Sequence, residues 1–155
     1  MTIEQALREE RLGSLSQPTP AWVPKGTSLK DTLRLMREED SGCVLVCDGD
    51  RPVGIFTERD VLNKVIGSGI PESEAVDRFM TPDPMCLTAG HSLGEAVRLM
   101  TIRGYRHIPL LDDKGRRNGL LSAKDIVRFI AEHFPAEVVN LPPELNQVFK
   151  TPEGG

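Results

Sequence analysis

Aromatic residues and cysteines are both scarce in this chain. Phe, Trp and Tyr make up 5% of its 155 residues, so a core has to be built from Leu, Val, Ile and Met. At this length roughly 68–70% of the unfolded surface can be buried, which suits one compact domain or two small lobes. The three cysteines, Cys43, Cys47 and Cys86, form no CxxC pair, and their odd number argues against a disulfide framework or a zinc site. Because Cys43 and Cys47 stand in an apolar run, we predict buried, reduced thiols and a cytoplasmic location.

Long apolar runs and an excess of basic residues are also missing. No run approaches the roughly 18 apolar residues of a membrane span, and the opening MTIEQALREE is too charged for a secretory signal. Lys plus Arg number 19 and Asp plus Glu number 23, which gives a net charge of −4. We predict no membrane contact and no general affinity for nucleic acid, although a local basic patch is compatible with this charge.

Sequence motifs for catalysis are lacking as well. The chain contains no GxSxG, HExxH, Walker or paired-carboxylate motif. The stretch Gly67-Ser68-Gly69 is a turn, because it lacks the preceding strand, the spacing and the Lys of a phosphate loop. His107 is the one residue that can be nominated as a base. We therefore predict a protein without enzymatic activity, without a metal site and without a required cofactor.

What the sequence does contain is an internal duplication, which is the most informative pattern in it. Two units of similar length match at a shift of 64 residues, and at a shift of 65 after one inserted residue. The matching segments at the first shift are Gly26-Thr27-Ser28-Leu29 with Gly90-His91-Ser92-Leu93, and Arg34-Leu35-Met36 with Arg98-Leu99-Met100. The matching residues at the second shift are Gly54 with Gly119, Thr57 with Ser122, and Asp60 with Asp125.

Each unit predicts the element order β-α-β-β-α, an α+β fold. Capping-box patterns begin a helix at Ser28 and at Ser92, followed by apolar residues at helical spacing. Two apolar runs around a turn then indicate a hairpin, and a second helix follows Thr57 or Ser122. The predicted strands cover residues 21–23, 43–47 and 53–56 in one unit and 85–87, 107–111 and 118–121 in the other.

The predicted domain organisation follows from these units and from the prolines. It consists of an N-terminal segment 1–15 with a helix at 3–12, a first repeat 16–68, a linker 69–84 with a short helix at 72–79, a second repeat 85–134 and a tail 135–155.

The segments that open the second helices are the candidate site. Thr57 and Ser122 are N-cap residues with an acidic residue three positions on. That carboxylate, Asp60 or Asp125, can also accept both hydroxyls of a ribose. Arg59 and Lys124 place a cation in the first turn, against the helix dipole, which a bound phosphate would favour. Solvent-facing cations are the alternative explanation.

The second repeat adds Arg106 and His107 at the start of a strand that continues into Pro109. Because Pro109 cannot donate in the ladder, this strand end is predicted at an edge or beside a cleft. Arg106 and His107 can then reach phosphate oxygens, although a His at a strand start is often structural. Their counterpart is Gly42-Cys43, so the two sites should be unequal. If one cleft is filled, we expect it to be the one around Asp125.

These residues resemble the CBS (cystathionine-β-synthase) repeat over residues 18–134. The resemblance rests on Gly-x-Ser-Leu before the first helix, on the hairpin, and on Gly-Ile-Phe-Thr-Glu-Arg-Asp and Gly-Leu-Leu-Ser-Ala-Lys-Asp, which match the family segment Gly-x-x-[Ser/Thr]-x-x-Asp. The run Arg106-His107-Ile108-Pro109 is similar to the Arg-His-[Leu/Ile]-Pro run of such repeats.

The resemblance implies an architecture and a ligand. Two repeats pack by their sheets with pseudo-twofold symmetry into a Bateman module, and two modules form a homodimer. The cleft between repeats binds AMP, ADP or ATP, with S-adenosylmethionine or NAD as alternatives. The implied ribose contacts are Asp125, Ser122, Asp60 and Thr57; the implied phosphate contacts are Arg106, His107, Lys124 and Arg59; the implied surround of the base is Val23, Cys43, Leu87, Ile108 and Pro109.

The function expected on these grounds is a non-catalytic regulatory module that senses adenine nucleotides and acts on an unidentified partner protein. A protein–protein interaction module without a nucleotide, in which the terminal helix and the Pro-rich tail bind the partner, is the main alternative. An enzyme that uses His107 and a nucleic-acid binder are the remaining hypotheses.

Overall fold

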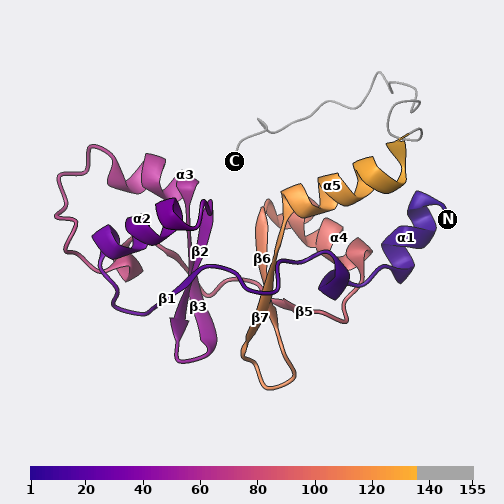
Figure 1. Ribbon diagram of the computed structural model, residues 1–155, viewed down its shortest axis with the longest axis horizontal. Coiled ribbons are helices and arrows are strands. Elements are labelled where there is room, and N and C mark those ends of the chain that lie inside the picture. Colours follow the sequence, from indigo (N-terminus) through magenta and orange to yellow (C-terminus); the bar gives the residue numbers. More distant parts are fainter. Residues whose placement is uncertain (136–155) are drawn as a thin grey trace.

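The computed structural model describes residues 1–135, and within them each repeat folds in the predicted order. The first repeat contains β1 (Trp22–Pro24), α2 (Leu29–Glu38), β2 (Cys43–Asp48), β3 (Arg51–Thr57), α3 (Glu58–Asp60) and a π-helical turn η2 (Val61–Val65). The second contains β5 (Leu87–Thr88), α4 (Leu93–Arg103), β6 (His107–Leu111), β7 (Arg117–Ser122) and α5 (Ala123–His133). Figure 1 shows the two repeats side by side, with their sheets toward the middle and their helices outside.

Two small sheets carry the fold, and they are built alike. The first has the strand order β1-β2-β3-β4, where β4 is Thr81–Pro82, and the second has the order β5-β6-β7. The opening strand of each repeat runs parallel to the next one, and the hairpin strands run antiparallel. Cys43 pairs with Thr57, and His107 pairs with Ser122 at the equivalent place. The predicted α+β hairpin repeats are therefore confirmed.

The predicted helix caps are present in both repeats. The Ser28 hydroxyl accepts from the Asp31 N–H, and Ser92 forms a reciprocal capping box with Glu95. Thr57 with Asp60 and Ser122 with Asp125 form capping boxes of the same kind. Each such cap satisfies backbone donors that the first helical turn leaves open, which contributes about 1 kcal/mol.

Alternation along β2 explains why its apolar run is buried on both faces. Val44 and Val46 pack with Phe56 under the helices of the first repeat. Cys43 and Cys47 point the other way and join a cluster between the two sheets. The whole of that cluster is Cys43, Leu45, Cys47, Ile55 and Leu120. The predicted buried thiols are thus confirmed for Cys43 and Cys47, while Cys86 is half-buried.

The segment before each repeat crosses to the other one. Residues 11 to 17 pair with the second repeat through the bridges Arg11↔Ser92 and Gln17↔Leu120. Residues 75 to 82 pair with the first repeat through Ser28↔Ala75 and through β4. Figure 1 shows the helix α1 (Ile3–Glu9) on the far side of the second repeat, next to α4. The duplication therefore includes the crossing of the preceding segment to the other repeat, as well as the order of helices and strands.

Two helices predicted in these crossing segments are shorter than expected. The predicted helix 3–12 ends at Glu9 and is followed by the 3-10 turn η1 (Leu12–Ser14). The predicted helix 72–79 is the 3-10 turn η3 (Val76–Arg78). The reason is that nearby main-chain groups bond to the loops before α2 and α4, as in Val76 N–H to Thr27 O and Leu12 N–H to His91 O.

Two further points concern a possible membrane span and the C-terminal tail. Within residues 1–135, no helix combines the length and the apolar character that crossing a membrane requires. The predicted tail 135–155 lies outside the described residues from position 136 onward.

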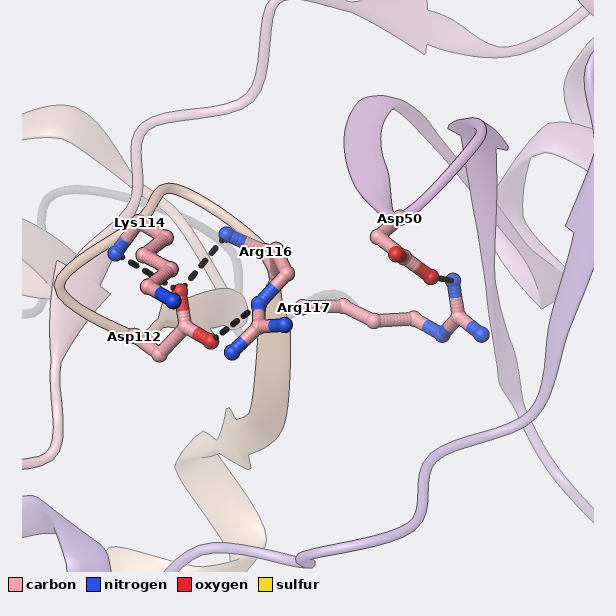
Figure 2. A network of polar contacts seen from close by, with 5 residues as sticks. All are labelled: Asp50, Asp112, Lys114, Arg116 and Arg117. Atoms are coloured by element: carbon pink, nitrogen blue, oxygen red, sulfur yellow. Dashed lines mark hydrogen bonds and ion pairs between the residues drawn. The ribbon is translucent and has the colours of Figure 1, made fainter.

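The hairpin turns of the two repeats are joined by Arg117. Its guanidinium Nη1 lies 3.3 Å from Asp50 Oδ1 and 3.2 Å from the Gly49 carbonyl oxygen, and its backbone N–H donates to Asp50 O. The same guanidinium stands 3.5 Å from the centre of the Trp22 ring. Figure 2 shows Arg117 reaching away from its own turn to Asp50, while Arg116 bonds back to Asp112 beside it. Arg117 therefore links the second repeat to two elements of the first.

Candidate functional site

Two clefts lie where the repeats meet, and each combines a hydroxyl–carboxylate motif with the opposite repeat. The Asp60 cleft is lined by Thr57 and Asp60 together with Arg106 and His107, and its volume is about 200 Å³. The Asp125 cleft is lined by Ser122, Lys124 and Asp125 together with Gly42 and Cys43, and its volume is about 610 Å³. Small-molecule sites usually measure about 300–1,000 Å³. The Asp125 cleft falls within this range of volumes, and the Asp60 cleft is smaller.

Asp60 is held on both carboxylate oxygens. Its Oδ2 accepts from the Thr57 N–H at 2.9 Å and from the Thr57 hydroxyl at 3.2 Å. Its Oδ1 lies 2.9 Å from the ammonium of Lys64. Asp60 is 6% exposed, so this carboxylate is a buried and fully engaged group.

Asp125 makes the same cap with a less engaged carboxylate. Its Oδ2 accepts from the Ser122 N–H at 2.8 Å. The Arg128 guanidinium stands 4.0 Å from Oδ1, which is beyond hydrogen-bond distance. The side chain is 20% exposed, compared with 9% for Asp60. The Asp125 carboxylate, which lines the cleft, is therefore less enclosed than that of Asp60.

His107 and Arg106 line both clefts. Burial lowers the pKa of His107 below its ordinary value, because the charged imidazolium is poorly solvated there. Asp125 and Glu58 act in the opposite direction and raise the pKa, while Lys124 and Arg106 lower it further. His107 thus stands among charges from both repeats, and the sequence had associated it with the Asp125 cleft alone.

Comparison with known proteins identifies the repeats. The family profile for the CBS domain matches twice, over residues 12–67 and 76–132. This chain belongs to the CBS-domain family. An uncharacterized protein of Methanopyrus kandleri is 35% identical over 95 residues, which is 60% of this chain and 48% of that protein. The chain thus spans about half the length of that curated relative.

Solved structures agree with the family and with the pairing of two CBS repeats. A CBS-domain protein from Burkholderia ambifaria is 32% identical, with a TM-score of 0.70 over 86% of this chain and 96% of that one. CBSX2, solved in complex with AMP, is 26% identical with a TM-score of 0.67, over 79% of this chain and 96% of that one. A CBS pair solved with 5-methylthioadenosine and S-adenosylmethionine is 16% identical with a TM-score of 0.70, over 77% of this chain and 98% of that one, and shows likeness of fold.

The two motif cations fall one in each cleft of this CBS pair. Arg59 lines the Asp60 cleft and Lys124 lines the Asp125 cleft. Each lies two residues after the N-cap, in the first turn of the second helix of its repeat. Within residues 1–135 no group of three His, Cys, Asp or Glu side chains is arranged to hold a metal ion.

The residues proposed to surround a base are more dispersed. Cys43 lines the Asp125 cleft, and burial, followed by the nearby Asp60 charge, raises the pKa of its thiol to about 12. The Cys43 thiol is therefore uncharged at neutral pH and gives the cleft wall apolar surface. Val23 and Ile108 lie in the helix-facing core clusters, Leu87 is packed against the second cluster, and Pro109 is buried on β6. Neither of the two clefts is lined by these four within the described residues, so their contact with a base stays a prediction.

Glu58 is a site residue that sequence reasoning missed. It lines both clefts, and its carboxylate lies against Gly42, where an added Cβ would be 3.1 Å from Glu58 Cδ. Its counterpart in the second CBS repeat is Ala123. This mismatch inside an otherwise repeated motif is the signal that could have identified it. A second missed residue is Lys64, whose spacing of four from Asp60 is typical of a helical ion pair.

Proposed function

We propose that this chain is a non-catalytic regulatory CBS pair that binds an adenine nucleotide in the Asp125 cleft. The observation that carries the proposal is the partly exposed Asp125 side chain, which lines a cleft of about 610 Å³. The Asp125 carboxylate and the Ser122 hydroxyl hold the ribose, and Lys124, Arg106 and His107 contact the phosphate. Cys43 supplies apolar surface to the base. The solved AMP complex of a 26%-identical CBS protein supports the choice of ligand class.

Thr57, Arg59 and Asp60 line the second, smaller cleft, and binding in the Asp125 cleft does not require them. Ligand binding then changes the angle between the repeats, because a ligand that contacts both repeats favours one arrangement by its differential affinity. A partner protein senses that change. We further propose a cytoplasmic homodimer, for which the exposed apolar side chains Leu62, Ile66 and Val127 on the second helices provide contact surface.

S-adenosylmethionine is the second candidate ligand. The Asp125 cleft contains Asp40 and Glu58 besides Asp125, which match the cations Arg106, Lys124 and Arg128 in number. A cleft with balanced charge can accept an adenosine derivative that carries a positive centre as readily as one that carries phosphate.

Calorimetry of folded, ligand-free protein with AMP, ADP, ATP and S-adenosylmethionine tests the proposal. We expect saturable binding of at least one of the four, without release of phosphate from ATP. Absence of binding by all four would reject the nucleotide-sensing function and favour the interaction module without a ligand.

A further inference from the structure

The carboxylates of Asp60 and Asp125 differ most in their ion-pair partner, which lies outside the motif. Lys64 lies one helical turn after Asp60, and its ammonium is 2.9 Å from Asp60 Oδ1. The same ammonium donates a hydrogen bond of 2.9 Å to the carbonyl oxygen of Phe79. Lys64 is therefore fixed at two points, one on the CBS motif and one on the segment of residues 75 to 82 that pairs with the first repeat.

The position of Lys64 is set by an irregular stretch of helix. The chain leaves the α-helical form after Asp60 and continues as the π-helical turn Val61–Val65, in which the Ile66 N–H bonds to Val61 O. Such π-helical turns within helices occur frequently at functional sites. The second helix of the other repeat, α5, runs without this interruption from Ala123 to His133.

The second repeat has no cation at the equivalent place. The counterpart of Lys64 at the shift of 65 is Phe129, whose ring stacks on His133 at 4.3 Å and offers no donor to Asp125. Asp125 Oδ1 has Arg128 at 4.0 Å as its ion-pair partner, which is too far for a hydrogen bond. The same family motif is thus closed by an internal cation in one repeat and accessible in the other.

We propose that Lys64 is a specificity-determining residue that closes the Asp60 cleft to adenosine ligands. Its ammonium occupies the carboxylate oxygen that a ribose hydroxyl would need, and the Thr57 donors occupy the other. A hydrogen bond from a neutral ribose hydroxyl to this carboxylate lacks the attraction between opposite charges that the Lys64 ammonium supplies, and displacing Lys64 would also leave its charge without this partner. The ligand therefore cannot displace Lys64 without loss, and the chain takes one ligand, in the Asp125 cleft.

The inference rests on the proposed function for the choice of ligand, and the experiment separates the two. Calorimetry with AMP uses the full chain carrying Asp125→Asn, which removes the charged contact in the Asp125 cleft. In this background we expect no binding, and we expect Lys64→Met to restore one AMP per chain, with the affinity of the Asp60 cleft raised about tenfold or more. Adding Asp60→Asn should abolish the restored binding.

Three control variants make the comparison specific. Lys64→Arg keeps a cation beside Asp60 and should leave the cleft closed. Lys30→Met, on the exposed side of α2, removes the same charge elsewhere and should have no effect. Lys64→Gln replaces Lys64→Met if the latter fails to fold, as judged by circular dichroism.

The outcomes distinguish the inference from the proposed function. The inference is overturned if the Asp125→Asn chain binds AMP through Asp60, or if the folded Asp125→Asn chain that also carries Lys64→Met or Lys64→Gln binds none. If wild type binds no AMP but the Lys64→Met chain gains an AMP that depends on Asp60, the inference holds and the assignment to the Asp125 cleft fails. Absence of binding in every chain rejects both.

Discussion

At the scale of single residues, Asp60 and Asp125 form the same kind of capping box but differ in their ion-pair partner and in their exposure. The reciprocal caps with Thr57 and Ser122 are confirmed, because a capping box depends on residues three apart in sequence. The Lys64–Asp60 pair was visible as an i,i+4 spacing. The bond from Lys64 to Phe79 O was not, because it depends on a segment fifteen residues away.

His107 predicts a change of stability with pH. Burial lowers the pKa of His107 in the folded protein below 6.5, its ordinary value. The unfolded chain then takes up a proton first as the pH falls through 6.5, so the free energy of unfolding should decrease below that pH. Above it both states are neutral at this residue, and His107 should contribute no slope. Urea denaturation at pH 7.5 and pH 5.5 measures the effect.

His107→Asn provides the comparison for that measurement. The variant lacks the titrating ring, so its free energy of unfolding should fall less between the two pH values than that of wild type. An equal fall in both proteins would contradict a buried, neutral His107, since the remaining titrating groups are the same in each.

At the scale of elements, the hairpins and first helices followed from periodicity, and the second helices did so in part. A helix after Ser122 is present as α5. The helix after Thr57 changes to π-helical bonding at Val61 and ends before Gly67, which has a φ of +75°. The glycines there indicate a shortened helix, but a residue pattern does not distinguish i+4 from i+5 acceptors. The irregularity beside the site was therefore beyond prediction.

The crossing segments show where local propensity fails. The predicted helices 3–12 and 72–79 are cut short because their backbone groups pair with the N-terminal ends of α4 and α2, respectively. Such tertiary pairing overrides helix propensity, which is a weak preference per residue. The repeat match in this stretch is limited to a few positions, such as Glu10 with Glu74 and Leu12 with Val76, which is too little to indicate the crossing in advance.

At the scale of the whole molecule, the clefts depend on how one sheet faces the other. The pairing of His107 with Ser122 within one hairpin supports the predicted association of His107 with the Asp125 motif. The packing of the sheets also brings Arg106 and His107 to Thr57 and Asp60. The motifs within one repeat do not indicate how its sheet packs against the sheet of the other repeat. The position of Arg106 and His107 in both clefts was therefore found only in the structure.

Arg117 predicts a measurable link between the repeats. Arg117→Met keeps the apolar stem but removes the contacts with Asp50 and with the Trp22 ring. We expect the free energy of unfolding to fall by about 1–2 kcal/mol, the sum of a cation–π contact and a weak ion pair. Urea denaturation with an unchanged slope measures the loss.

Arg116→Met is the matched control for Arg117→Met. Arg116 bonds to Asp112 within its own turn (Figure 2), so its loss should leave the link between repeats intact and the stability closer to that of wild type. Equal losses for the two variants would contradict a special role for Arg117.

The central claim is that the Asp125 cleft binds the adenine nucleotide, and one paired titration tests it most directly. Wild type, Asp125→Asn and Asp60→Asn are titrated with AMP by calorimetry, after circular dichroism has confirmed that all three are folded. We predict one AMP per chain in wild type, retention of that binding in Asp60→Asn and its loss in Asp125→Asn. Loss of binding in Asp60→Asn with retention in Asp125→Asn would contradict the account.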